Sequence, residues 1–143
     1  MSSGFKFIDH TADIAIEVSG STYEELFNAA VEGWKETSIE PSGETRGLIE
    51  KIIKLEEDSP EVLLVSFLQE MNYNFLSKKI FPAEIKGLRI YKKDNRLELK
   101  CKILFRNISQ KDFIKTEIKA VTFHQLDIKK TGNVYRTIIV FDI

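Results

Sequence analysis

The 143-residue chain is long enough for one hydrophobic core, and we expect residues 1–143 to form a single domain. Hydrophobic residues make up 43% and charged residues 30%, which is typical of a globular protein in water. No stretch approaches the roughly 18 apolar residues of a membrane span, and the first residues lack the apolar segment of a secretory signal. We therefore expect a cytoplasmic protein that does not contact a membrane.

Acidic and basic residues are unevenly distributed along the chain. Residues 17–70 contain 13 acidic and 4 basic residues, whereas residues 71–143 contain 16 basic and 7 acidic residues. Folding either interleaves these charges on a mixed surface or leaves an asymmetry that steers a partner, and both interpretations remain open. Lysine outnumbers arginine 16 to 5, with few aromatic residues between the basic ones, so a sequence-specific nucleic-acid surface is not indicated.

The first half of the chain combines strand and helix patterns. Ser21-Thr22-Tyr23-Glu24 has the form of a capping box, and Ser59-Pro60 places a capping serine before a proline at the first helical position. Apolar residues follow each start at helical spacing, and Trp34 belongs to the face expected in the core. The predicted elements are strands over 5–9, 13–19 and 48–55, and helices from 22 to about 36 and from 60 to about 79.

The second half reads mostly as strands. Residues 85–92 and 97–104 flank a predicted hairpin turn, and residues 118–129 and 134–143 form a second predicted hairpin. Residues 107–116 are polar and predicted to be irregular, while Cys101 shares the apolar face of its strand. The pattern predicts an α+β fold of two layers, in which about two helices cover a mainly antiparallel sheet.

Common catalytic and zinc-binding motifs are absent. The chain contains no G-x-x-x-x-G-K-[ST] or G-x-G-x-x-G phosphate loop and no G-x-S-x-G nucleophile elbow. Cys101, His10 and His124 are too few, and too irregularly spaced, for a structural zinc site. The residues alone therefore do not indicate an autonomous enzyme.

Carboxylates accumulate at two points that the sheet could bring together. An apolar strand runs to the last residue, Ile143, so its terminal carboxylate is expected to be held in place beside Asp142. If this strand lies next to the one that opens at Asp13, three carboxylates converge, and such oxygen ligands suit Ca²⁺, Mg²⁺ or Mn²⁺. Alternatively, Asp13 accepts hydrogen bonds from a turn and Asp142 is merely solvated.

Three further polar residues have open roles. His10 and His124 fit either hydrogen-bonded imidazoles in the interior or groups that support a site. Lys119 fits either a solvated strand lysine or a contact to a partner or an RNA phosphate.

Three segments of the chain resemble motifs of the archease family. They are His10-Thr11-Ala12-Asp13-Ile14-Ala15-Ile16, which continues to Ala29-Ala30, then Ile118-Lys119-Ala120-Val121-Thr122-Phe123-His124, and the ending Val140-Phe141-Asp142-Ile143. Their order and the chain length agree with the family, although Phe123 stands where many members have tyrosine. The resemblance implies an archease-like fold over the whole chain.

The resemblance also implies a function. Archeases are accessory proteins of the RtcB-type RNA ligase, which joins tRNA exons and other broken RNA ends and uses GTP and Mn²⁺ to guanylylate its own histidine. The family promotes that step and supports repeated turnover, so RNA contact is expected to be indirect or weak. Its metal site maps onto Asp13, Asp142 and the terminal carboxylate of Ile143, with Ca²⁺ the first candidate and Mg²⁺ or Mn²⁺ the others. Lys119 and His124 carry over only as motif positions without a firm role.

Two alternative functions remain open. The family is also associated with a chaperone-like effect on a tRNA methyltransferase, and such an activity would survive loss of the carboxylates but depend on the charged surface. A metal-dependent phosphohydrolase would instead need a general acid or base near the metal, for which His10 or His124 is available. The expected function is activation of a ligase without catalysis by the chain itself.

Overall fold

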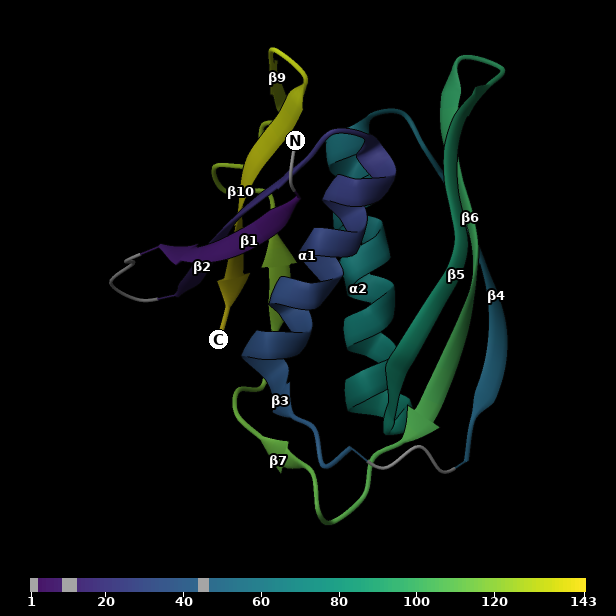
Figure 1. The fold of residues 1–143 in the computed structure, drawn as a ribbon, viewed down its shortest axis with the longest axis vertical. Helices are drawn as coiled ribbons and strands as arrows, with labels where there is room; N and C mark the ends of the chain where they lie inside the picture. The colour runs from purple at the N-terminus through teal and green to yellow at the C-terminus, as the bar shows by residue number, and fades with distance from the viewer. Residues whose placement is uncertain (1–2, 9–12, 44–46) are drawn as a thin grey trace.

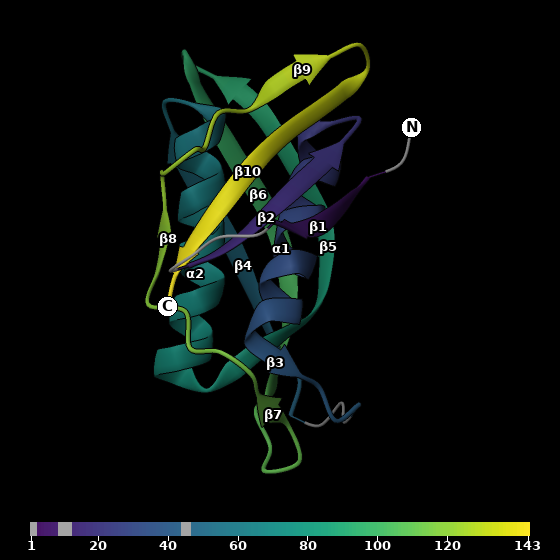
Figure 2. The same ribbon diagram turned by 90° about the vertical axis from the view of Figure 1, so that its left-hand side faces the viewer.

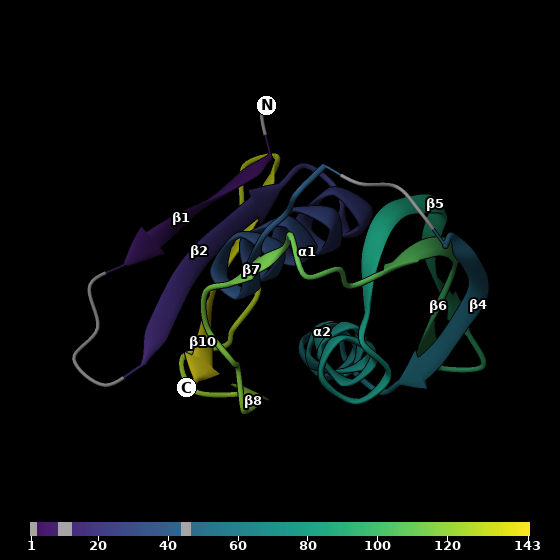
Figure 3. The same ribbon diagram turned by 90° about the horizontal axis from the view of Figure 1, so that it is seen from below.

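Two helices lie between antiparallel sheets in the computed structural model, which describes residues 3–8, 13–43 and 47–143 (Figure 1; Figure 3). The elements are, in chain order, β1 (Gly4–Ile8), β2 (Ile14–Gly20), α1 (Tyr23–Ser38), β3 (Ile39–Glu40), β4 (Ile49–Glu57), α2 (Pro60–Lys78), β5 (Ile80–Lys93), β6 (Arg96–Asn107), β7 (Phe113–Ile114), β8 (Ala120–Thr122), β9 (Lys129–Thr131) and β10 (Val134–Asp142). No helix within these described residues is long and apolar enough to cross a membrane.

The strands form two main sheets that the helices separate. One sheet has the order β1-β2-β10-β8, with β9 also paired to β10, and the other has the order β4-β6-β5. Helix α1 packs mainly on β1 and β2, whereas α2 packs on β4, β5 and β6 and also reaches β8. A short β3-β7 pair lies at one end of the molecule (Figure 1). The α+β class is confirmed, but the helices form a middle layer instead of covering one face of a single sheet.

The core lies where the two helices meet the inner faces of both sheets. Trp34 is fully buried, as predicted, and its ring stacks on that of Phe81 with centroids 5.5 Å apart. Burying each such side chain contributes about 2–3 kcal/mol, so the aromatic residues hold the layers together. The largest fully buried side chains besides Trp34 include Phe27, Phe67, Phe81, Phe105 and Phe141.

Local sequence determines the helix starts. The first helix begins one residue later than the predicted capping box implies, since the Oγ1 atom of Thr22 accepts from the backbone N–H of Glu25 at 3.1 Å. A Glu25 carboxylate oxygen accepts in return from the backbone N–H of Ser21 at 3.0 Å. Two overlapping S/T-x-x-E patterns are therefore present, and the second one caps the helix. The second helix begins as predicted, with Ser59 as its cap.

The prediction of one continuous strand over 118–129 is wrong. This segment is divided into β8 and β9 by a turn in which the backbone N–H of Leu126 donates to the carbonyl of Phe123 at 3.1 Å. Gln125 in this turn has a left-handed φ of 61°, which interrupts the extended backbone of a regular strand. The β5 strand also begins earlier than predicted, at Ile80, directly after the left-handed Lys79 that ends α2.

Candidate functional site

The register of β2 and β10 places Asp13 and Asp142 at the same end of their sheet. The last pair of these antiparallel strands is Phe141 with Ile14, so Asp142 and Asp13 stand one position beyond it. Phe141 and Ile14 contact the core, and side chains alternate along a strand. Continued by one residue, this register makes Asp13 and Asp142 neighbours at the ends of adjacent strands.

The chain end beside Asp142 is held by strands on both sides. Asp142 pairs with Ala120 of β8, and its carbonyl accepts from the backbone N–H of Lys119 at 2.7 Å. Ile143 follows directly and is 40% exposed, so the terminal carboxylate is placed at the end of an anchored strand. Figure 2 shows this end of β10 between the starts of β2 and β8. Two of the three predicted carboxylate groups are thereby brought to the same end of the sheet, with the chain end beside them, and we call Asp13, Asp142 and the terminal carboxylate of Ile143 the carboxylate edge.

A buried polar network that sequence reasoning missed supports this edge. The indole Nε1 of Trp34 donates to the Oδ1 atom of Asn72 at 3.0 Å, and the Nδ2 atom of Asn72 donates to the carbonyl of Ile118 at 2.7 Å. Asn72 thus ties α1 and α2 to the residue before Lys119. One signal was available, because Asn72 is a polar residue four positions after Leu68 on an otherwise apolar helix face.

A surface hollow of about 380 Å³ borders Asp13. Ile8 and Ile14 give it an apolar wall, while Glu36 and Lys115 form an ion pair of 3.6 Å on its rim. The hollow is open to a ligand or a partner side chain next to the carboxylate edge.

The donor set at this edge fits a hard cation. Among the described residues, no group of three His, Cys, Asp or Glu side chains is close enough together to hold a metal ion. The predicted set has only two such side chains and needs the terminal carboxylate as its third ligand. All three offer oxygen, which suits Ca²⁺, Mg²⁺ or Mn²⁺ and not a thiolate- or imidazole-binding metal.

The three residues predicted to support the site, His10, Lys119 and His124, differ in where they lie. His10 lies outside the described residues. Lys119 is exposed and contacts Asp142 through its backbone, so it stands at the carboxylate edge. His124 lies in the turn after β8, where its N–H donates to Thr122 Oγ1 at 3.2 Å. Because Thr122 pairs with Val140, His124 is displaced along β10 away from Asp142.

Comparisons with known proteins agree over nearly the whole chain. Residues 5–143 match the model of the archease protein family. The archease of Thermotoga maritima is 37% identical over 141 residues, covering 96% of this chain and 98% of that protein. The archease of Archaeoglobus fulgidus is 31% identical over 140 residues, covering 97% and 98%.

Two solved structures share the fold. The solution structure of protein 1598 of Methanobacterium thermoautotrophicum superimposes with a TM-score of 0.81 at 26% identity, covering 98% of this chain and 99% of the other. A crystal structure from Thermotoga maritima, described as an archease and possible chaperone, gives a TM-score of 0.60 at 30% identity, with 96% of each chain covered. The order of elements around the carboxylate edge is thus an arrangement found in other organisms.

Proposed function

The chain belongs to the archease protein family, and from this premise we propose that it is a cytoplasmic, metal-binding accessory protein that activates an RtcB-type RNA ligase. The observation that supports the proposal is the position of Asp13 and Asp142 at neighbouring strand ends, next to the anchored chain end. These are the carboxylates that the family resemblance assigns to a metal site.

The carboxylate edge is suited to act on another protein's reaction centre. Like charges on adjacent strands repel one another, so a bound divalent cation stabilises the edge by balancing them. When bound, the cation supplies positive charge, and Asp13, Asp142 and the terminus of Ile143 hold it at the rim of the protein. Because β2 and β8 fix both sides of β10, the edge is presented to a partner without an ordering cost.

Activation then consists of positioning. Docking of the carboxylate edge stabilises the ligase conformation in which its histidine, the GTP phosphates and its metal are aligned. Alignment and charge neutralisation account for most of the catalysis in phosphoryl transfer. The accessory protein needs no general acid or base of its own, which agrees with the displacement of His124 from Asp142.

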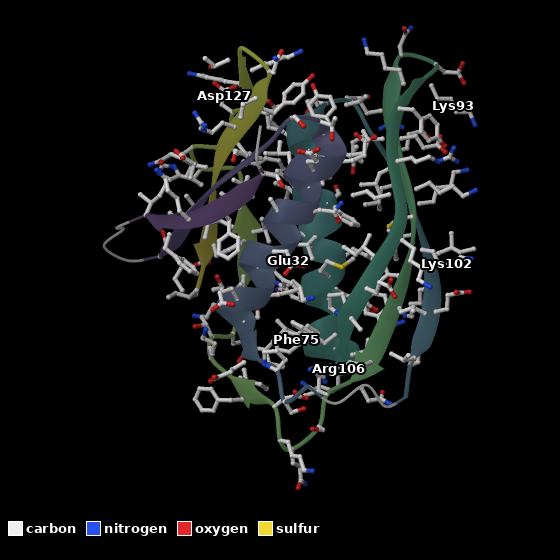
Figure 4. All side chains as sticks on the ribbon, viewed as in Figure 1. Glu32, Phe75, Lys93, Lys102, Arg106 and Asp127 are labelled. Carbon is white, nitrogen blue, oxygen red and sulfur yellow. The ribbon has the colours of Figure 1, made fainter. Side chains whose placement is uncertain are left out.

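The test is guanylylation of the ligase from the same organism with labelled GTP. The native chain is expected to increase the initial rate of guanylylation. The variants Asp142→Asn and Asp13→Asn are each expected to stimulate the rate at least about tenfold less than the native chain does. Asp127→Asn is the matched control, because Asp127 is an exposed aspartate near β9, away from the carboxylate edge (Figure 4).

Circular dichroism is the control for folding of the variants. Calorimetric titration with Ca²⁺ alone measures cation binding directly. Full stimulation by both edge variants would show that the carboxylates are not used.

A second candidate is a chaperone-like action on a tRNA methyltransferase. It is favoured by exposed apolar side chains, and the crystal structure from Thermotoga maritima is described as a possible chaperone. Phe7, Phe113, Ile114 and Phe123 are each more than half exposed. This function predicts protection of the methyltransferase from aggregation by Asp142→Asn as well as by the native chain.

A further inference from the structure

The outer face of the β4-β6-β5 sheet carries a block of positive charge. Side chains that face away from the helices occupy two adjacent rows across the three strands. From β4 through β6 to β5, these rows are Lys54–Lys100–Arg89 and Ile52–Lys102–Lys86. Five of the six positions are cationic, and we call Lys54, Lys86, Arg89, Lys100 and Lys102 the cationic face. Figure 4 shows Lys102 on this sheet, on the opposite side of the molecule from Asp127.

A β-bulge creates this arrangement. Lys86 pairs with Lys102 and Arg89 pairs with Lys100, so three steps along β5 oppose two steps along β6. Gly87, with a φ of 61°, is the left-handed residue of the bulge. Without the extra residue, strict alternation would turn Arg89 toward the helices. The bulge therefore aims Arg89 outward, onto the same face as Lys86.

The cations are only partly neutralised within the protein, although Lys54 forms an ion pair with the nearly buried Glu98 at 3.5 Å. Lys54 opposes Lys100, Lys86 opposes Lys102 and Arg89 opposes Lys100, and like charges directly opposite one another destabilise a sheet. Lys102 and Lys86 reach Glu50 and Glu84 only at 3.9 Å, in exposed pairs that contribute little.

The positive charges at the centre of the cationic face have even fewer acidic partners. Among the described residues, no ion pair joins Arg89 or Lys100 to a carboxylate within 4.0 Å. The acidic side chains lie at the two ends of the face, so the repulsion is concentrated in the middle.

The cationic face also has the shape and the apolar contacts of a binding surface. A hollow of about 450 Å³ opens at the bulge and is lined by Lys86, Arg89, Lys100 and Lys102. Ile52 borders it with 66% of its surface exposed. Tyr91, partly exposed, lies next along β5, with the Arg89 guanidinium 6.0 Å from its ring centre.

We propose that the cationic face binds single-stranded nucleic acid through its phosphate backbone. The face offers N–H donors and almost no acceptors, which matches a row of phosphates that carry acceptors only. The lysines provide contacts that depend on charge and salt and carry no base readout. Unpaired bases can pack on Ile52 and the Tyr91 ring, which favours a single strand over a duplex.

The test measures fluorescence anisotropy of a labelled 20-nucleotide oligouridylate between 50 and 200 mM salt. The native chain is expected to bind with an affinity that falls steeply with salt. The double variant Arg89→Gln/Lys100→Gln is expected to bind about tenfold more weakly at low salt, with a salt slope smaller by about 1.4, since each single-strand phosphate contact contributes about 0.7.

The double variant Lys129→Gln/Lys130→Gln is the matched control, because it removes two exposed lysines from β9 on the other sheet. Its affinity is expected to stay within twofold of the native chain. An equal loss in the control would overturn the proposal, since general charge would then explain the binding.

A fold check and two competitors complete the design. Removal of a like-charge pair is expected to leave the melting temperature of Arg89→Gln/Lys100→Gln unchanged or raised, so weaker binding cannot be attributed to unfolding. Polyglutamate of equal length tests an acidic protein surface as the occupant, and a duplex of the same length tests the preference for a single strand. The proposal fails if either competitor displaces the oligouridylate as well as unlabelled oligouridylate does.

Discussion

Arg106 and Asp112 form an ion pair whose side chains are only 5% and 0% exposed. The Nη1 and Nη2 atoms of Arg106 each donate to one Asp112 carboxylate oxygen at 2.9 Å. Asp112 also accepts from the backbone N–H groups of Ser109 and Ser42, at 2.7 and 2.9 Å. The Arg106 guanidinium, helped by these hydrogen bonds, holds the pKa of Asp112 well below its usual range.

Asp112→Asn is expected to lower the free energy of unfolding by about 3 kcal/mol at pH 7, because it leaves the Arg106 charge buried without its partner. The lowered pKa in the folded protein means that the ion pair stabilises fully above the pKa of an unfolded aspartate, about 3.9. As the pH falls below that value, the native chain loses this stabilisation. Urea denaturation should therefore show a smaller difference between native and variant at pH 3 than at pH 7.

Glu117→Gln, at an exposed position after the same loop, is the control and should stay within about 0.5 kcal/mol of the native chain. An equal difference between native and Asp112→Asn at both pH values would contradict the ion-pair explanation.

The sequence predicts the positions of residues better at the carboxylate edge than at the Arg106–Asp112 ion pair. Asp13 and Asp142 each adjoin a strand with a clear period of two, so the sequence could place both at strand ends, and the pairing of Ile14 with Phe141 brings those ends together. The partner of Asp112 could not be predicted, because residues 107–116 have no period that fixes where a side chain points.

At the scale of elements, Asn72 of α2 links both helices to the segment that leads into β8. Replacing it with alanine would remove an acceptor for the Trp34 indole and a donor for the Ile118 carbonyl, both of which are buried. An unpaired buried polar group costs about 1–3 kcal/mol, which outweighs the higher helix propensity of alanine. Asn72→Ala is therefore expected to lower the free energy of unfolding in urea by about 2–3 kcal/mol.

Asn28→Ala on the exposed side of α1 serves as the control and should be neutral or slightly stabilising. A neutral Asn72→Ala would show that the network does not hold β8 to the helices.

Elements with strong local signals were predicted well, and those set by distant contacts were not. The helix over Pro60–Lys78 has a serine cap, a proline at its first position and an apolar face, all local features. The break between β8 and β9 has a distant contribution, because the Ile128 backbone N–H donates to a Glu61 carboxylate oxygen from α2 at 2.9 Å. No pattern within residues 118–129 reveals that partner.

At the scale of the whole molecule, the uneven charge of the chain becomes a spatial asymmetry. Four of the five cations of the cationic face come from residues 71–143, and Lys54 alone comes from the acidic half. Mixing of opposite charges is limited to the ends of this face, where Glu50, Glu84 and Glu98 lie. The charge asymmetry of the sequence is therefore located on the outer face of the β4-β6-β5 sheet, where it supports the proposed binding surface.

The carboxylate edge and the cationic face belong to sheets on opposite sides of the helices (Figure 3). A helix is about 10 Å wide, so the middle layer separates the two surfaces by more than the range over which substitutions usually interact. We expect Asp142→Asn to weaken Ca²⁺ binding and leave oligouridylate affinity unchanged, and Arg89→Gln/Lys100→Gln to do the reverse. In the triple variant the two losses should add, with a coupling energy below about 0.5 kcal/mol.

Calorimetry with Ca²⁺ and anisotropy with oligouridylate, performed on all four proteins, give the coupling energy directly. A coupling above about 1 kcal/mol would mean that the helices transmit a change between the sheets. Independence would instead mean that the protein can hold a nucleic-acid strand on one side while the carboxylate edge stays free to dock on a partner with the other. Two surfaces that act separately on a rigid middle layer are what an accessory protein needs in order to bring a strand and an enzyme together.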